Sequence, residues 1–474
     1  MAHRRVGPLT VLSAFTGAGG LDLGLEYAGF ETVACIELDK WARETIITNR
    51  PHWNLLETGD IVSAAYELKP ADVGLAPREL SVLAGGPPCQ PFSTAAQWAE
   101  SSRAGMNDSR SIGLLAFLHL AEKFLPHVIL IENVPGFVLG SSSALEILTH
   151  ELSRINSKHG TAYRIESKIL SAEEFGIPQR RRRAIAIARR DGKAFGWPVP
   201  THLARPIRAY DALWNIIPDS LPVPRGQWAE LLATIPAGMN YQYHTTRGSG
   251  RPIFGHRTRF WSFLLKLSPD QPAWTIPAQA GPATGPFHWD NRPLAPEELA
   301  RLQSFPVDWL FEGGEGAKRK QIGNATPPLL AEVIGYAIGR SVFGSRRSGI
   351  PKLSLKRKRA VPFPPAPSGV PVHFYETIGV QSPHPGVGHG PGATRRQSRL
   401  LLNELVAGLH AMCAYGARVN RSASETSQDT RTAALVEGSA LSAHLEAEEQ
   451  STLSPFDSKD DLGSGRREAA IQAA

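Results

Sequence analysis

The sequence is poor in cysteine and has no long apolar run. Its three cysteines, Cys35, Cys89 and Cys413, stand far apart in 474 residues, and this spacing supports neither a disulfide framework nor a zinc site. Free thiols persist in a reducing compartment. No apolar stretch approaches the ~18 residues that span a bilayer, and the amino terminus has no signal-peptide core. These absences predict a cytoplasmic protein with no metal site and no membrane partner.

Net charge is also small. Lys and Arg number 51 against 44 Asp and Glu, which gives +7. Much of the excess lies in residues 341–420, where 11 basic residues face 2 acidic ones. Binding of an acidic polymer would therefore depend on a local basic cleft and not on a uniform field. Residues 345–474 hold basic runs among many Pro and Gly without a core pattern, which predicts a disordered tail.

Residues 9–190 alternate between strand-like and helix-like segments. This alternation predicts an α/β fold with a doubly wound, mostly parallel sheet. Strands are expected at 9–15, 31–38, 79–85, 127–133 and 184–189, and helices at 39–49, 112–124 and 144–158.

The composition changes at about residue 192, where Pro, Gly, Trp and His become frequent and helical periodicity fades. This change predicts a small irregular domain at 192–291, inserted between two parts of the α/β domain at 1–191 and 292–344.

The segment GGPPCQPFS at 85–93 places Cys89 directly after a predicted strand. Pro87 and Pro88 fix φ and remove two backbone donors, so the chain must leave the strand as a stiff extended segment. Cys89 would then lie at the mouth of the sheet, where a nucleophile belongs; a buried structural cysteine is the alternative. The polar, small-residue segment 90–106 that follows predicts a mobile lid, with an ordinary surface loop as the alternative.

Two further polar motifs adjoin apolar runs. Glu132 and Asn133 end a predicted buried strand, the position where open α/β sheets place their ligands. The run QRRRR at 179–183 comes directly before another strand, so we expect these arginines to point at an anion or a polar ring. A solvated basic turn is the alternative.

The first predicted strand leads into a glycine-rich loop, FTGAGGLDLG at 15–24. Glycine lets the backbone turn tightly and approach a ligand. The dinucleotide pattern G-x-G-x-x-G fails because Asp22 stands at its third glycine, which argues against NAD and suits S-adenosylmethionine, a molecule without a pyrophosphate. Glu37, at the next strand end, is placed to bind a ribose diol, and Asp60 to accept from an adenine amine. The alternative is that both are surface acids at strand ends.

PPCQPFS, ENV and QRRRR, in this order, resemble the DNA (cytosine-5)-methyltransferase family of bacterial restriction-modification systems. The resemblance covers residues 9–340 with a gap around 200–290. The remaining similar blocks lie at 15–30, 59–61, 108–110 (the weakest), 292–306 and 322–338.

The resemblance implies a Rossmann-like methyltransferase that moves a methyl group from S-adenosylmethionine to carbon 5 of a cytosine in a specific double-stranded DNA sequence. The base would be flipped out of the duplex and joined covalently to Cys89. Glu132 would bind ring nitrogen 3 and the exocyclic amine, and Arg183 the carbonyl oxygen at position 2. Arg181 and Gln179 would support the loop and cleft. Asn324 is expected to open the last helix and close the cofactor pocket.

The implied site residues form three sets, and residues 192–291 become the target-recognition domain. Arg180 and Arg182 fall at variable positions of their block and stay unassigned. The catalytic set is Cys89, Glu132, Asn133, Arg181 and Arg183; the cofactor set is Phe15, Gly17, Gly19, Gly20, Leu21, Glu37, Asp60, Ile61, Pro88 and Asn324; the DNA-contacting set is Gln90, Ser93 and Gln179.

The leading interpretation is a monomeric modification enzyme whose cognate endonuclease, if one exists, acts independently. An RNA (tRNA) cytosine methyltransferase of the same architecture and a catalytically silent DNA-binding paralogue remain as alternatives. An NAD-binding oxidoreductase is disfavoured by the failed glycine spacing.

Overall fold

The computed structural model describes residues 8–88, 111–139, 143–255, 259–345, 349–353, 355 and 360–377. The chain divides into two compact units, Met1–Arg399 and Leu400–Ala474, and every described residue belongs to the first. Cys89, Gln90 and Ser93 lie outside the described residues, as do the predicted lid at 90–106 and the block at 108–110.

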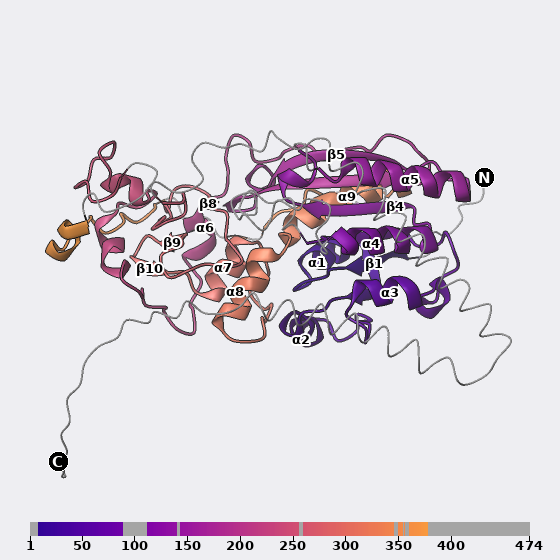
Figure 1. The fold of residues 1–474 in the computed structure, drawn as a ribbon, viewed down its shortest axis with the longest axis horizontal. Helices are drawn as coiled ribbons and strands as arrows, with labels where there is room; N and C mark the ends of the chain where they lie inside the picture. Colours follow the sequence, from indigo (N-terminus) through magenta and orange to yellow (C-terminus); the bar gives the residue numbers. More distant parts are fainter. Residues whose placement is uncertain are drawn as a thin grey trace, which may run out of the picture. The chain divides into compact units, whose positions relative to one another are not determined.

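A six-stranded sheet forms the centre of the α/β part, with the strand order β2-β1-β3-β4-β7-β5 (Figure 1). Neighbours among β2, β1, β3 and β4 are parallel, whereas β7 runs antiparallel to both β4 and β5. The prediction of a mostly parallel sheet is confirmed. The strands are β1 (Leu9–Ala14), β2 (Phe30–Ile36), β3 (Val82–Gly85), β4 (Val128–Asn133), β5 (Arg164–Ser171) and β7 (Arg182–Arg189).

The helices expected from the apolar spacing are present. Among the elements that connect the strands are α1 (Gly20–Tyr27), α2 (Lys40–Asn49), α3 (Ile61–Glu67), α4 (Ser111–Phe124) and α5 (Leu145–His159). The strand β5 was not expected, because its sequence RIESKILS has few buried positions at the edge of the sheet.

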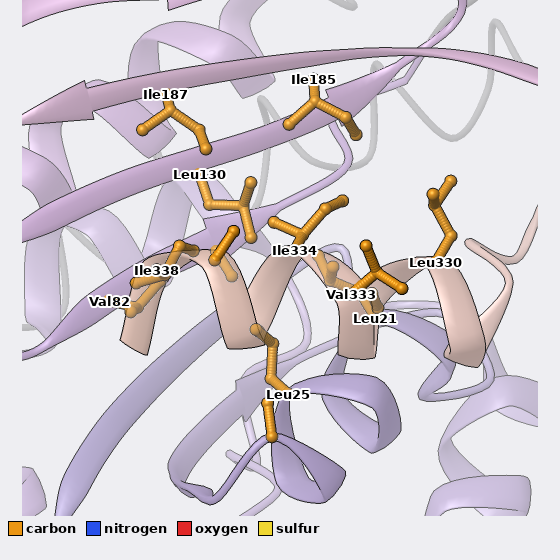
Figure 2. Close-up of a cluster of buried hydrophobic side chains, with 14 of the residues drawn as sticks. Leu21, Leu25, Val82, Leu130, Ile185, Ile187, Leu330, Val333, Ile334 and Ile338 are labelled. Atoms are coloured by element: carbon orange, nitrogen blue, oxygen red, sulfur yellow. The ribbon is translucent and has the colours of Figure 1, made fainter. Parts of the chain in front are cut away.

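The chain returns to the sheet after residue 292 through α7 (Pro296–Leu302), α8 (Glu315–Asn324) and α9 (Pro328–Phe343). Figure 2 shows side chains of α9 gathered with Leu25 of α1 and with Leu130 and Ile185 of the sheet. Ile334 and Ile338 of α9 are about 1% exposed or less, and each such side chain contributes about 1.5–3 kcal/mol through burial. The last helix is therefore part of the core that supports the sheet.

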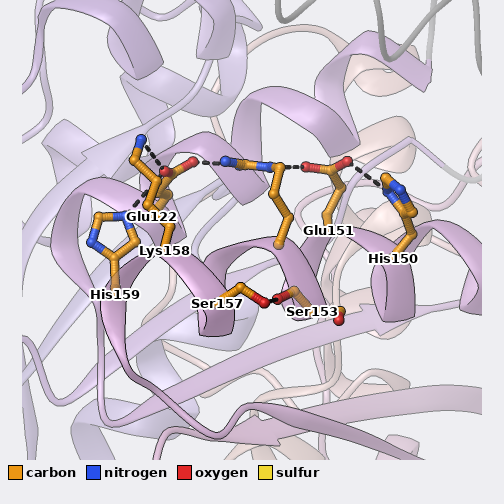
Figure 3. A network of polar contacts seen from close by, with 8 residues as sticks. Glu122, His150, Glu151, Ser153, Ser157, Lys158 and His159 are labelled. Carbon is orange, nitrogen blue, oxygen red and sulfur yellow. Dashed lines mark hydrogen bonds and ion pairs between the residues drawn. The ribbon is translucent and has the colours of Figure 1, made fainter.

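A buried carboxylate joins α4 to α5 (Figure 3). Glu122 of α4 accepts hydrogen bonds from Arg154, from Lys158 Nζ at 2.8 Å and from His159 Nε2 at 3.0 Å. Burial alone would raise the pKa of Glu122, but these donors hold it well below its ordinary value. The same arginine also donates to Glu151, so the cluster stabilises the packing of the two helices behind the site.

Residues 192–291 are irregular, as the composition predicts. Their regular elements are short: α6 (Ala209–Leu213), β8 (Ala273–Trp274) and β9 (Phe287–His288), which pairs with β10 (Arg292–Pro293). One apolar cluster lies largely within this region and includes Leu231, Tyr241 and Phe263. A second cluster combines Leu267 and Ile276 with residues of α1, α2, α7 and α8, so this region shares a core with the α/β part.

Part of the expected disordered tail is ordered. Phe374, in a 3-10 turn at Val372–Thr377, is 4% exposed and stacks on Trp228 with ring centroids 5.9 Å apart. The Ser368 N–H donates to the Ala233 carbonyl at 3.0 Å. For residues 360–377 the prediction of a disordered tail is wrong, because aromatic side chains among the prolines complete the apolar cluster around Trp228.

Candidate active site

Two opposite charges meet at the carboxyl end of β4. Glu132 Oε1 lies 2.9 Å from Arg183 Nε, and the two side chains are 8% and 12% exposed. The strand register explains the contact: Asn133 of β4 pairs with Ala184 of β7, so an antiparallel β7 begins where β4 ends. The sequence placed both residues in the catalytic set, and the structure brings them together.

Asn133 fixes the segment that leads to Cys89. It is 3% exposed, and its Nδ2 donates to the Pro87 carbonyl at 2.9 Å. A Cβ built at Gly86 would lie 3.6 Å from Glu132 Oε2, so this segment passes beside the carboxylate.

Gln179 and Arg181 do not reach the surface. Both are fully buried. Arg181 Nη2 donates to the carbonyls of Gly323 and Ala325 at 2.8 and 3.0 Å, and Nη1 to that of Ile276 at 3.5 Å. Arg181 therefore positions the surrounding segments, and in this arrangement its guanidinium is bound to the protein backbone.

The amide of Gln179 is likewise used inside the protein. Its Nε2 donates to Gln303 Oε1 at 2.9 Å and to the Leu302 carbonyl at 3.3 Å, and its Oε1 accepts from the Ile276 N–H. A side chain with no exposed surface offers nothing for DNA to contact. The DNA contact expected from the sequence is thus replaced by a bracing role for Gln179.

The glycine-rich loop forms a tight turn around a carboxylate. Gly17 and Gly19 have φ of 56° and 78°, in the left-handed region that glycine tolerates best. The Gly17 N–H donates to Glu37 Oε2 at 2.6 Å, and the Asp39 N–H donates to Glu37 Oε1 at 2.7 Å. Burial raises the pKa of Glu37 above its ordinary value, against the opposite effect of these two donors.

Close backbone approaches join the other cofactor residues to this loop. A Cβ at Gly20 would lie 2.3 Å from the Thr326 carbonyl, and one at Gly59 would lie 2.3 Å from the Glu37 carbonyl. Asp60, next to Gly59, caps α3 by accepting from the Ser63 N–H at 2.8 Å. Only glycine permits these approaches, which bring the acid-bearing loops together.

Aromatic and apolar residues complete the same end of the sheet. The Phe15 ring lies 3.2 Å from the position of a Cβ at Gly113, and Pro88 Cδ lies 3.9 Å from it. The Phe15 ring and Pro88 thus flank the same position on α4. Ile61 and Leu21 are 8% and 6% exposed. Leu21 packs into the core, so its contact with a cofactor would come from its backbone.

Asn324 is exposed and ends α8, so it does not open the last helix as the sequence suggested. The last helix instead begins at Pro328, and a proline in its first turn costs no helical hydrogen bond. The carbonyls on both sides of Asn324 are those bound by Arg181, and Thr326 touches the cofactor loop. Asn324 therefore lies beside the cofactor residues although the helix assignment was wrong.

The comparison with known families agrees with this geometry. Residues 9–340 match the family described as C-5 cytosine-specific DNA methylase. The chain belongs to this family. It is a DNA (cytosine-5)-methyltransferase.

Curated relatives support the assignment along most of the chain. The methyltransferase is 33% identical over 369 residues to the type II methyltransferase M.SacI of Streptomyces achromogenes, covering 70% of this chain and 92% of the relative. It is 33% identical over 364 residues to M.Eco47II of Escherichia coli, with 70% and 78% covered. It is 32% identical over 352 residues to M.Sau96I of Staphylococcus aureus, with 69% and 75% covered.

The fold is also similar to a solved structure. A crystal structure of an E. coli prophage protein, assigned as a DNA modification methyltransferase, covers 71% of this chain and 100% of its own, with a TM-score of 0.50 and 20% identity. At this identity the likeness concerns the fold alone.

Two buried residues of the methyltransferase were not singled out as site residues from the sequence. Asp22, treated only as a departure from the dinucleotide pattern, is fully buried in α1, and burial raises its pKa to about 7. Gln303 links Gln179 to the Ile322 carbonyl, to which its Nε2 donates at 2.6 Å. The only feature of the sequence that pointed to Gln303 is its position in the block at 292–306.

Two features typical of other protein classes are absent from the described part of the methyltransferase. Its His, Cys, Asp and Glu side chains form no group suited to holding a metal ion. None of its helices combines the length and apolar character needed to cross a membrane.

Proposed function

We propose that this methyltransferase uses S-adenosylmethionine to methylate carbon 5 of cytosine within one double-stranded DNA sequence, as the modification enzyme of a type II restriction-modification system. The observation that carries the proposal is the Glu132–Arg183 pair beside the segment that leads to Cys89. The type II relatives named above support the biological setting. We further propose a monomer that works independently of any cognate endonuclease.

The residues around the glycine-rich loop fit S-adenosylmethionine. Each carboxylate oxygen of Glu37 accepts one N–H, and each retains a second lone pair for a ribose hydroxyl. Asp60 would accept from the adenine amine, with Phe15 and Ile61 on the two sides of the ring, and Pro88 and Asn324 would close the pocket. When bound, S-adenosylmethionine supplies an electrophilic methyl group on its sulfonium.

The cytosine ring needs activation because carbon 5 is a poor nucleophile. In our mechanism the Glu132 carboxylate takes up a proton from water as the base binds. The Cys89 thiolate then adds to carbon 6, and the electron pair moves through the ring to nitrogen 3, which receives that proton from Glu132. Carbon 5 becomes an enamine carbon that accepts the methyl group. Nitrogen 3 returns its proton to Glu132, and a water molecule takes the proton from carbon 5 as the double bond between carbons 5 and 6 re-forms and the thiolate leaves.

Arg183 stabilises this adduct. Its Nε faces Glu132 and its Nη1 donates to the Arg182 carbonyl at 2.9 Å. A guanidinium has five N–H donors, so others can bind the carbonyl oxygen at ring position 2, where negative charge develops. The base must leave the duplex to reach this buried pair, at a cost of a few kcal/mol.

Methylation-sensitive sequencing of a host that lacks other cytosine methylation tests the proposal. Expression of the chain should mark one short sequence throughout the genome. Tritium transfer from labelled cofactor to duplex DNA, compared with tRNA, identifies the substrate. Transfer to tRNA alone would support the RNA methyltransferase alternative, and transfer to neither would support a silent DNA-binding protein.

A further inference from the structure

The segment that leads into β7, including β6 (Gln179–Arg180), carries arginines that the Glu132–Arg183 pair does not use. Side chains alternate along it: Gln179 and Arg181 are buried, whereas Arg180 is half-buried and Arg182 exposed. These residues precede the position where β4 and β7 first pair, so they extend beyond the end of β4 that bears Glu132. A strand rises about 3.3 Å per residue, so the Cα atoms of Arg180 and Arg183 lie within about 10 Å.

The Arg180 side chain is held in place. In the parallel pairing of β6 (Gln179–Arg180) with β8, Arg180 lies opposite Trp274, and its Cζ is 4.8 Å from the indole centroid. Its Nη2 donates to Gln271 Oε1 at 2.7 Å, and its carbonyl accepts from Thr275 Oγ1 at 2.6 Å. One of the five guanidinium N–H groups is thus used, and most of the fork remains for a ligand.

A second tryptophan extends this group to the surface. Trp261 meets Trp274 edge to face, with centroids 5.8 Å apart, and is 53% exposed. Its backbone is anchored, because its carbonyl accepts from Asn240 Nδ2 at 2.8 Å. The neighbouring Phe260 is 42% exposed. Trp261 and Phe260 thus expose aromatic surface beside the Arg180 guanidinium, and exposed aromatic side chains beside a cation are typical of an interaction surface.

We propose that Arg180, Trp261 and Trp274, which we name the Arg180 cluster, bind the DNA backbone next to the target cytosine, with Arg180 donating to a phosphate. This inference rests on the proposed function. Each DNA strand carries one phosphate per about 3.4 Å of rise, so a distance of about 10 Å spans roughly three phosphates. Because the Cα of Arg180 lies within about 10 Å of that of Arg183, we expect Arg180 to reach a phosphate among the first three nucleotides beside the target. A guanidinium is weakly hydrated and binds phosphate with two parallel hydrogen bonds, and the stack on Trp274 fixes its direction beforehand.

Salt-dependent binding tests the cluster. The affinity of the full chain for a duplex with the target sequence is measured by fluorescence anisotropy between 50 and 200 mM salt. For Arg180→Gln we expect weaker binding, on the order of tenfold at low salt, and a slope of log K against log salt reduced by about 0.9. Trp274→Leu keeps the charge but removes the stack, so it should weaken binding with the slope unchanged.

Arg164→Gln is the matched control. Arg164 is exposed on β5 and pairs with Arg189, at the far end of β7 from Arg183. The variant loses the same charge and should match the wild type in affinity and slope. The unfolding temperature of each variant shows whether it is folded.

The outcomes separate this inference from the proposed function. If the wild type methylates DNA and folded Arg180→Gln binds it like Arg164→Gln, the phosphate contact is overturned. If Arg180→Gln keeps the slope but relaxes the preference at one base pair, Arg180 reads a base edge and the assignment to phosphate is wrong. A wild type that neither binds nor methylates DNA overturns both.

Discussion

Glu132 and Arg183 hold each other in position before a substrate base arrives. The pair sits in a nearly buried place where neither charge is well hydrated, so each charge depends on the other for its stabilisation. Such preorganisation is effective in catalysis because little reorientation is needed when charge develops. At the scale of single residues, the proposed chemistry depends on this pair and on the Cys89 thiol.

Cys89→Ser should abolish methyl transfer and leave cofactor and DNA binding largely intact, because a hydroxyl is a far weaker nucleophile than a thiolate. DNA with 5-fluorocytosine at the target should trap the wild-type enzyme covalently, since fluorine blocks the final elimination. A denaturing gel measures the adduct. If no adduct forms under turnover conditions, the covalent mechanism is wrong.

Glu132→Gln should lower the single-turnover rate by about 10²–10⁴-fold, the typical contribution of a proton-transferring side chain. The amide has nearly the same shape but cannot deliver the proton. The loss should appear in kcat and much less in DNA affinity, which is measured separately by anisotropy. A near-normal single-turnover rate would show that Glu132 has another role.

Asp22→Asn should change how stability depends on pH. Burial raises the Asp22 pKa from 3.8 to about 7, so between these values the folded state binds more protons than the unfolded state. The contribution of Asp22 to the free energy of unfolding is therefore fully present below pH ~4. It is lost as the pH rises through ~7, and the loss amounts to a few kcal/mol at most. Asparagine does not ionise, so the variant does not lose stability in this way as the pH rises. The free energy of unfolding, measured by denaturant at pH 5 and pH 8, should therefore favour the variant increasingly at pH 8; parallel profiles would contradict the prediction.

At the scale of elements, the direction of β7 decides where the arginine lies. An antiparallel β7 starts at the carboxyl end of β4, which brings Arg183 to Glu132. If β7 ran parallel to β4, it would begin at the amino end of β4, and Arg183 would lie at the opposite end of the strands from Glu132. Residues 360–377 likewise contribute to the packing of residues 192–291, because Phe374 stacks on Trp228.

Truncation after Thr377 should leave stability and methylation unchanged, whereas truncation after Gly344 should lower the unfolding temperature and weaken DNA binding. The shorter chain loses Phe374 and exposes Trp228, and removal of a buried Phe side chain costs about 3 kcal/mol or more. Limited proteolysis within residues 192–291, together with thermal unfolding, measures the effect. Equal unfolding temperatures for the two truncations would show that 360–377 contributes nothing to the fold.

At the scale of the whole described unit, Arg181 connects three segments distant in sequence. Its guanidinium binds the carbonyls on both sides of Asn324 and the carbonyl of Ile276, within residues 192–291. Gln179 and Gln303 add further bonds among the same segments. The segment around Asn324 and residues 192–291 are therefore both attached to the segment that leads into β7, the strand of Arg183.

Arg181→Ala should destabilise the protein and raise KM for both cofactor and DNA. It leaves several buried carbonyls without donors, at about 1–3 kcal/mol for each unsatisfied group. Thermal unfolding and steady-state kinetics at permissive temperature measure the two effects. Arg181→Lys, which retains the charge but not the fork, should recover only part of the loss. A variant with both KM values unchanged would exclude the positioning role.

The sequence by itself determined the family, the mostly parallel sheet and the choice of Glu132 and Arg183 as candidate catalytic residues, because motif order and apolar periodicity are local properties of the chain. A supporting role for Gln179 and Arg181 follows from the resemblance, but the tertiary structure alone decided that both side chains are fully buried and which groups they bind. Burial depends on segments around residues 276, 303 and 323 that are remote in sequence. The tertiary structure also decided the edge strand β5, the end of α8 at Asn324 and the docking of Phe374. Each of these depends on which neighbour covers a side chain, and that is settled only when the chain is packed.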